Sequence, residues 1–175
     1  GTSPWIFYTN GAGTFAADAA GSGSSQAGHL VITAQGTNIQ LYQANVALEP
    51  NASYQLNFKA YSSTGNDLAV SLLKHVAQYT NYGLNQVFDL TSSWKTYSVQ
   101  FPTSGFTTAI NDGRLMLWLA SYAVNGDEYF IDDVVLEKIA SPNQTDTTPP
   151  VVAITSPTSG STVLDMVTVF ATASD

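Results

Sequence analysis

Apolar and polar residues alternate one by one in most of the apolar segments of this chain. In 54–61, YQLNFKAY, the residues Tyr54, Leu56, Phe58 and Ala60 alternate with polar or amphipathic residues. Successive side chains of a strand point to opposite faces, whereas a helix repeats its apolar face every three to four residues. The alternation therefore predicts β-strands that are buried on one face only.

Clusters of Gly, Asn and Ser, such as NGAG, GSGSSQAG, SSTGND and AVNGDE, separate these segments and are typical of turns. The expected strands are 5–8, 14–17, 29–33, 39–48, 53–61, 68–75, 85–90, 95–101, 114–121 and 128–138. No segment has the period of an amphipathic helix, although one turn of helix within 76–86 is left open. Many short strands of this kind predict an all-β fold, an antiparallel β-sandwich.

The composition limits the class of partner. Hydrophobic residues make up 44% of the 175 residues and aromatic residues 11%, which is enough for one sizeable core. The net charge is −8 with only five Lys and Arg residues, which argues against nucleic acid or an anionic membrane as partner and favours a neutral one. There is no cysteine, and no apolar run approaches the roughly 20 residues of a membrane span.

The character of the chain changes near residue 140. The segment 140–150 has no apolar periodicity and reads as a linker between a domain at 1–139 and a second piece at 151–175. That piece has a strand pattern at 151–155 and another at 163–173, and two strands cannot bury a core alone. It is therefore expected to be the start of a second domain. The first residue is Gly1 and no signal peptide precedes it, so we expect the sequence to begin inside a longer protein.

Three motifs resemble a known family. They are L-x-P-x-x-x-Y-x-L-x-F-x-A at 48–60, W-x-x-Y-x-x-x-F at 94–101 and YFIDDVVL at 129–136. Over residues 1–138 the chain resembles the carbohydrate-binding modules of families 4, 9, 16 and 22, which are jelly-roll sandwiches related to galactose-binding-like domains. The tail from Pro149 is similar to the first two strands of a bacterial immunoglobulin-like repeat. Members of the family usually begin with a strand ending in Asn-x-x-Phe-Glu, which is absent here. An edge strand and a usual metal ligand are therefore expected to be missing unless residues upstream of this sequence supply them.

The strand 114–120, RLMLWLA, carries the first candidate site. Its leucines fall on one side, whereas Arg114, Met116 and Trp118 fall on the side expected to meet water. The resemblance implies that aromatic residues on a concave sheet bind glycans. Trp118 is then a stacking platform for the C–H face of a sugar, and Arg114 a hydrogen-bond donor to its hydroxyls. The alternatives are that a loop covers Trp118 or that the two faces are inverted.

Further candidates come from the polar sides of other strands and from one loop. The amide, tyrosine and charged side chains are expected to hydrogen-bond sugar hydroxyls, with an ordinary solvated sheet as the alternative. Tyr79 and Tyr82 in the loop 75–86 form a groove wall or cap the core, and Trp5 is a core residue or a secondary sugar contact. The candidates beyond strand 114–120 are Gln40, Tyr42, Gln55, Asn57, Lys59, Tyr61, His75, Tyr79, Tyr82 and Trp5.

The carboxylates of 127–133 indicate a metal rather than catalysis. In strand 128–136, Asp132 shares a side with Val134 and Leu136, where an ionised carboxylate needs a cation or dense hydrogen bonding, including bonds from backbone amides. The resemblance implies a structural calcium ion there, held first by Asp132, then by Asp133, with Asp18 a weaker choice. Clustered on one strand and its turn, these carboxylates offer no pair facing each other across a cleft, as glycosidases require. The two histidines, His29 and His75, form no catalytic or metal spacing with a nucleophile.

The resemblance and the residues together predict a function. We expect non-catalytic binding of a neutral polysaccharide, such as β-glucan, mannan or xylan, by a module attached to a secreted bacterial glycoside hydrolase. The competing prediction is a structural or adhesive spacer domain of a secreted or cell-surface protein, with no sugar site.

Overall fold

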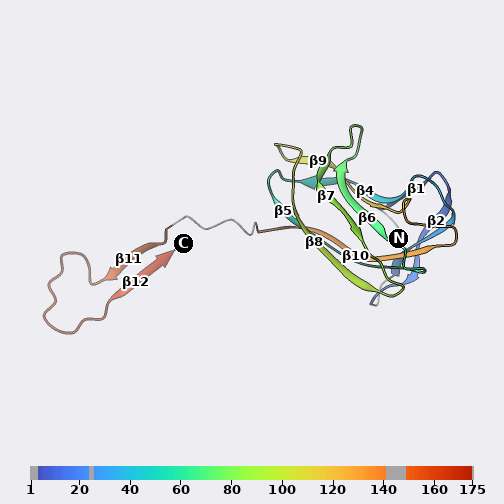
Figure 1. Ribbon diagram of the computed structural model, residues 1–175. Coiled ribbons are helices and arrows are strands. Elements are labelled where there is room, and N and C mark those ends of the chain that lie inside the picture. Colours follow the sequence, from blue (N-terminus) through green and yellow to red (C-terminus); the bar gives the residue numbers. More distant parts are fainter. Residues whose placement is uncertain (1–3, 24–25, 141–148, 175) are drawn as a thin grey trace. The chain divides into compact units, whose positions relative to one another are not determined.

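The alternating segments form two five-stranded antiparallel sheets that face each other (Figure 1). The computed structural model describes residues 4–23, 26–140 and 149–174. The chain divides into two compact units, Gly1–Ser141 and Pro142–Asp175, and the two sheets belong to the first. The described residues contain no helix able to cross a membrane.

The first sheet, here called the β9 sheet, has the order β1-β4-β9-β6-β7. Its strands are β1 (Ile6–Thr9), β4 (Ile39–Leu48), β9 (Ile110–Trp118), β6 (Leu68–Lys74) and β7 (Asn81–Phe88). The second, called the β10 sheet, has the order β2-β3-β10-β5-β8. Its strands are β2 (Ala12–Ala20), β3 (Gln26–Ala34), β10 (Glu128–Ile139), β5 (Ser53–Ser62) and β8 (Lys95–Pro102). The predicted all-β jelly-roll sandwich is confirmed.

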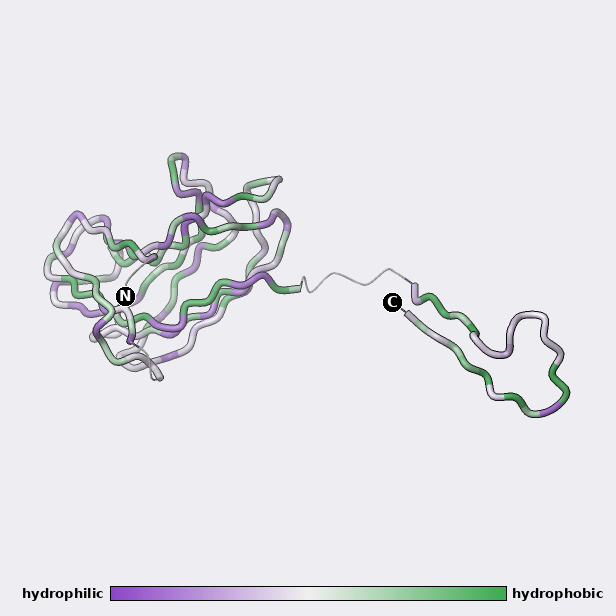
Figure 2. The backbone as a smooth tube through the Cα atoms, turned by 180° about the vertical axis from the view of Figure 1, so that it is seen from behind, coloured by the Kyte–Doolittle hydropathy of each residue, from purple (hydrophilic) through white to green (hydrophobic). Residues whose placement is uncertain are grey.

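The core lies between the sheets and is made by one side of each strand. Leu115 and Leu117 of β9 are each 2% exposed, and Phe58 of β5 is also 2% exposed. Their neighbours along each strand are half-buried on the outer faces, so the alternation read from the sequence is the alternation of burial. Figure 2 shows the same change between hydrophobic and hydrophilic residues along the strands of this unit.

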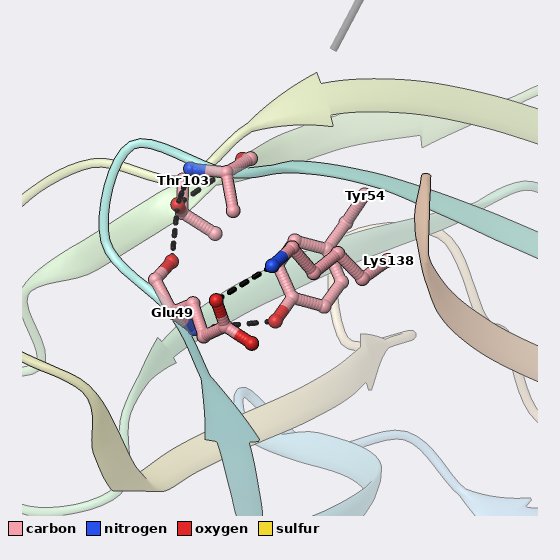
Figure 3. A network of polar contacts seen from close by, with 5 residues as sticks. Glu49, Tyr54, Thr103 and Lys138 are labelled. Atoms are coloured by element: carbon pink, nitrogen blue, oxygen red, sulfur yellow. Dashed lines mark hydrogen bonds and ion pairs between the residues drawn. The ribbon is translucent and has the colours of Figure 1, made fainter. Parts of the chain in front are cut away.

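One polar network ties the two sheets together at the end of β4 (Figure 3). The Thr103 hydroxyl, just after β8, donates to the backbone oxygen of Glu49 over 2.7 Å. The Tyr54 hydroxyl of β5 accepts the Glu49 backbone N–H over 3.2 Å, and Lys138 Nζ of β10 lies 2.6 Å from Glu49 Oε2. Because Glu49 follows a strand of the β9 sheet, whereas its partners belong to the β10 sheet, these contacts fix how the sheets meet.

The structure differs from the expected strands at several boundaries, two of which concern β7 and β9. The turn of helix left open within 76–86 is not formed, because residues 81–86 already pair with β6 as part of β7. β9 begins at Ile110 rather than at 114, and its first residues pair with Val46 and Leu48 across register shifts. The stretch 110–113, INDG, contains residue types typical of turns, which explains why its extension was missed.

The second unit contains one hairpin of β11 (Val151–Ser156) and β12 (Phe170–Ser174). The second strand begins at Phe170 rather than at 163. The β11 residues Val151, Val152 and Ile154 are 64–69% exposed, as expected for two strands that have no further layer to pack against. Figure 2 shows this strand as hydrophobic.

Candidate functional site

The outer face of the β9 sheet gathers side chains from five strands into cross-strand rows. One row runs Tyr8, Gln40, Trp118, Ala69 and Val87, from β1 to β7. The next row runs parallel to it, and its members are Ile6, Tyr42, Met116, Ser71 and Asn85. Residues opposite each other in neighbouring strands point to the same side of a sheet, so both rows line one surface.

A groove of about 250 Å³ crosses this surface. Trp118 and Met116 of β9 form part of its floor, and Tyr79 from the β6–β7 loop stands on its wall. Its lining residues are Asn38, Gln40, Leu73, Tyr79, Arg114, Met116 and Trp118. None of them is acidic, so the groove holds no pair of carboxylates of the kind that glycoside hydrolysis requires.

The two large rings at this groove have no aromatic neighbour. Among the residues that the structure describes, neither Trp118 nor Tyr79 makes a ring–ring contact. Trp118 is half-buried, and its indole N–H donates to Ser121 Oγ over 3.3 Å, which fixes the ring at its polar edge. Tyr79 is 57% exposed. No aromatic side chain therefore has to be displaced for a ligand to pack on either ring.

Arg114 is held on the same surface by several partners. Its Nε donates to His75 Nδ1 over 3.1 Å, and Nη2 donates to the His75 backbone oxygen over 2.7 Å. Its Nη1 donates to Gln40 Oε1 over 3.1 Å. The guanidinium carbon lies 4.7 Å from the centre of the Tyr42 ring and 5.7 Å from that of Tyr79. Most of the N–H donors of Arg114, which the sequence analysis assigned to sugar hydroxyls, are thus bonded to the protein itself.

The other polar strand singled out from the sequence lies on the opposite side of the molecule. β5 pairs with β10 and β8, so Asn57, Lys59 and Tyr61 lie on the outer face of the β10 sheet. Gln55 lies there too and donates to Asn57 Oδ1 over 3.0 Å. These candidates and those of β4, Gln40 and Tyr42, therefore lie on opposite faces of the sandwich, because the consecutive strands β4 and β5 belong to different sheets.

The aromatic residues of the β10 sheet cover one another. The ring of Phe130 stacks on His29 on one side, with centroids 4.5 Å apart, and on Tyr61 on the other, at 4.3 Å. Trp94 packs edge-on against Tyr61 at 4.8 Å. The faces of Phe130 are therefore occupied from both sides, unlike those of the rings at the β9-sheet groove.

Two further candidates lie away from the groove: Tyr82 is buried and Trp5 is half-buried. Tyr82 is 3% exposed, packs against Phe106, and donates its hydroxyl to Asp112 over 2.9 Å. Of the two alternatives for this residue, the structure shows the core cap. Burial and the Asp112 carboxylate raise the pKa of Tyr82 to about 12. Trp5 packs against the core, away from the groove, and lines a separate cavity with Phe15.

The carboxylates predicted to bind calcium have separate partners. Asp18 accepts from His29 over 3.2 Å, and Asp133 pairs with Lys59 at 2.9 Å. Asp132 accepts the backbone N–H groups of Ser22 and Asp133 over 3.0 and 2.9 Å. Within residues 4–23, 26–140 and 149–174, no three acidic or histidine side chains gather around a common point for a metal. Because Ca²⁺ takes six to eight oxygen ligands, this donor set does not fit the ion, and calcium binding stays a prediction.

Asp132 also lies on a different side from the one expected. It pairs with Lys59 on the outer face, whereas Val134 and Leu136 pack against the core. A register shift between Asp132 and Val135, with Asp133 at a φ of 49°, reverses the sides within β10. One extra residue in a bulge has this effect, so a strict count of two along the strand gives the wrong face.

Some residues of the surface were missed in the sequence. Tyr8 is 49% exposed and lies in the same cross-strand row as Trp118. The alternation in WIFY, with Phe7 inward, was the available signal for Tyr8. Asn38 and Leu73 line the groove, but a single amide in a turn and a leucine in an apolar strand carry no local signal of a site.

Comparisons with known proteins place the chain in a family. The structure described as "CBM4 structure and function" aligns with a TM-score of 0.64 at 19% identity, over 79% of this chain and 97% of its own length. The N-terminal cellulose-binding domain of Cellulomonas fimi β-1,4-glucanase C aligns with a TM-score of 0.59 at 20% identity, over 78% of this chain and 90% of its own.

A third structure, the CBM22-1 xylan-binding domain of Paenibacillus barcinonensis Xyn10C, has a TM-score of 0.53 at 12% identity, over 78% of this chain and 86% of its own. At these identities the likeness shows the fold. No curated protein matches the chain. The family model for carbohydrate binding domains of families 4 and 9 matches residues 1–123, which confirms the resemblance read from the motifs. The chain therefore belongs to this family of carbohydrate-binding domains, which bind carbohydrate and do not catalyse its cleavage.

Proposed function

We propose that the groove on the outer face of the β9 sheet binds one chain of a neutral polysaccharide, such as β-glucan, mannan or xylan. In the parent protein, which we take to be a secreted bacterial glycoside hydrolase, the module holds the catalytic domain against that polysaccharide. Tethering of this kind raises the local concentration of substrate and requires no new chemistry.

The observation that carries the proposal is the difference between the two outer faces. At the groove, the Trp118 and Tyr79 rings have no aromatic neighbour, whereas Tyr61 and Phe130 on the β10 sheet stack on each other. A sugar presents a C–H face that packs against a free aromatic face and removes weakly held water from both. Both outer faces thus carry aromatic residues. Within the described part of the chain, the two rings at the groove have no ring stacked on them, whereas Tyr61 and Phe130 on the other face stack on each other.

The polar groups around the groove suit a neutral ligand. Asn38 provides an amide nitrogen and Tyr79 a hydroxyl, both of which exchange hydrogen bonds readily with sugar hydroxyls. Gln40 is 7% exposed, and its amide already bonds Asn38 and Arg114. The one cation on the lining, Arg114, already donates to His75 and Gln40. The net charge of −8 further disfavours a polyanion. One platform and a few hydrogen bonds that compete with water predict dissociation constants in the micromolar to millimolar range.

Electrophoresis through gels that contain soluble β-glucan, mannan or xylan tests the proposal. The wild type is expected to be retarded by at least one of them. Trp118→Ala removes the platform and is expected to abolish retardation with only a modest fall in melting temperature, because the side chain packs against the core but is only half-buried. Trp94→Ala is the matched control, since it removes a half-buried tryptophan from the opposite face.

Three results are decisive. Retardation of the wild type and Trp94→Ala, but not of Trp118→Ala, supports the proposal. Equal retardation of the wild type and Trp118→Ala rules out the stacking role. Absence of retardation by every polysaccharide of the panel contradicts the binding function and favours the spacer domain.

A further inference from the structure

The wall of the groove is a short loop whose position depends on few contacts. Residues 75–80 connect β6 to β7 and carry Tyr79, which has a φ of 52°. At the base of the loop, His75 N–H donates to Asp112 O over 2.9 Å and Lys74 N–H donates to Thr80 O over 2.8 Å. Within the loop, Tyr79 N–H donates to Val76 O over 3.0 Å. These backbone bonds close the loop but do not fix the exposed Tyr79 ring.

Arg114 connects this loop to the floor of the groove. The guanidinium lies between the rings of Tyr42, on β4, and Tyr79, on the loop, at 4.7 and 5.7 Å. Two of its nitrogens donate to His75, one to the ring and one to the backbone oxygen, and a third donates to Gln40. A cation over a ring face and a planar fork of donors both depend strongly on orientation. Arg114 therefore links the loop, the floor of the groove and Tyr79. These contacts of Arg114 are called the joint below.

The joint requires a particular protonation state of His75. Arginine has only donors, so the 3.1 Å contact between Arg114 Nε and His75 Nδ1 needs an unprotonated Nδ1. His75 must then be neutral, with its proton on Nε2. Protonation of Nδ1 removes the acceptor and brings a second positive charge against the guanidinium.

Within the part of the chain that the structure describes, His75 forms no ion pair with a carboxylate. Its backbone contacts Asp112, but the Asp112 carboxylate accepts from the hydroxyl of Tyr82. The Tyr42 ring lies 5.9 Å from the imidazole. Among the described residues, the titratable and charged groups around His75 are Arg114, Tyr42, Tyr79, Asp112 and Lys74.

We infer that Arg114 is a positioning residue, which holds Tyr79 over the groove by its bonds to His75, and that protonation of His75 releases Tyr79 and weakens binding of the polysaccharide. The inference rests on the proposed function of the groove. It gives Arg114 a different role from the one read in the sequence, because its donors serve the loop rather than sugar hydroxyls. Binding by this module is then lost in acid and retained at neutral and alkaline pH.

The experiment measures affinity for the retained polysaccharide at about pH 8 and pH 5, the range over which histidine side chains change charge. The wild type is expected to bind about tenfold more weakly at the lower pH, since a hydrogen bond to a charged group is worth about that factor. His75→Asn places an amide oxygen near the position of Nδ1 and does not titrate there. This variant is expected to bind with equal strength at both pH values.

His29→Gln is the control for the other histidine, which lies on the β10 sheet between Asp18 and Glu128. It is expected to keep the pH dependence of the wild type. A spectroscopic readout is independent of affinity: ¹⁵N chemical shifts of the His75 ring at pH 8 are expected to show the proton on Nε2.

Four outcomes overturn the inference. Equal binding by the wild type at both pH values removes the pH effect, while the proposed function stands. A pH dependence that persists in His75→Asn places its origin elsewhere, and a proton on Nδ1 at pH 8 removes the bond from Arg114. Absence of binding at pH 8 overturns the proposed function and the inference with it. A pH dependence lost in His75→Asn and kept in His29→Gln supports the inference.

Discussion

A buried carboxylate in the connection between β9 and β10 offers a graded test of the structure. Asp127 is 0% exposed, and its side chain accepts three hydrogen bonds. Thr64 Oγ1 donates to Oδ1 over 2.9 Å, while Asn66 Nδ2 and the Val124 backbone N–H donate to Oδ2 over 2.7 and 2.9 Å. These bonds join the β5–β6 loop to the β9–β10 connection, which follows Trp118 and contains its partner Ser121.

Two substitutions of Asp127 are expected to differ in cost. Asp127→Ala removes all three bonds and leaves two N–H donors without an acceptor. A bond to a charged group is worth about 1.5 kcal/mol, so the loss is about 4.5 kcal/mol. Asp127→Asn keeps the geometry, because its oxygen accepts from Asn66 and Val124 while its nitrogen donates to the Thr64 hydroxyl. Only the contribution of the charge is lost, at about 1 kcal/mol.

Urea unfolding followed by tryptophan fluorescence measures the difference. With a slope of about 2 kcal/mol per molar urea, the midpoint falls by about 2 M for Asp127→Ala and by about 0.5 M for Asp127→Asn. Asp133→Asn is the control, because it removes the charge of an exposed ion pair with Lys59, which is worth less than about 1 kcal/mol. Equal losses for the two Asp127 variants, or a loss for Asp127→Ala no larger than that of the control, would refute this account of the carboxylate.

Two other predictions concern alkaline stability and calcium. Folding raises the pKa of Tyr82 from 10.0, the ordinary value of a tyrosine, to about 12. The protonated Tyr82 hydroxyl therefore contributes its full stabilisation below pH 10, and this stabilisation is lost as the pH rises toward 12. Tyr82→Phe therefore lowers the melting temperature at pH 8, and its deficit against the wild type is expected to be smaller at pH 11; an unchanged deficit contradicts the assignment. Because Asp18, Asp132 and Asp133 have separate partners, EDTA is expected to leave the melting temperature of the wild type unchanged. A fall on chelation that added calcium reverses would establish the ion.

The strands and the two sides of β9 could be predicted because burial is repeated locally. Leu115, Leu117 and Leu119 must all reach the core, so the alternation of the sequence fixes which side Trp118 occupies. The same reasoning failed for Asp132, because the bulge at Asp133 depends on a positive φ that no sequence period reveals.

The composition of the site could be predicted only in part, because it depends on which strands become neighbours. Gln40 and Tyr42 join Trp118 through the pairing of β4 with β9, whereas Lys59 and Tyr61 pair across to β10. In an antiparallel sandwich, consecutive strands often cross to the other sheet, and nothing within β5 itself indicates which sheet it enters. The joint formed by Arg114 likewise needs three elements to meet, so its residues could be identified as candidates while the contacts among them could not.

The indole N–H signals of the three tryptophans provide the most direct test of where the polysaccharide binds. Trp118 lies at the groove, Trp94 lies on the outer face of the β10 sheet, and Trp5 packs against the core. Titration of the ¹⁵N-labelled protein with a soluble β-glucan, mannan or xylan that retards it in gels is expected to shift the Trp118 signal and to leave the Trp94 signal in place. A shift of Trp94 with Trp118 unmoved would place the ligand on the opposite sheet and contradict the account.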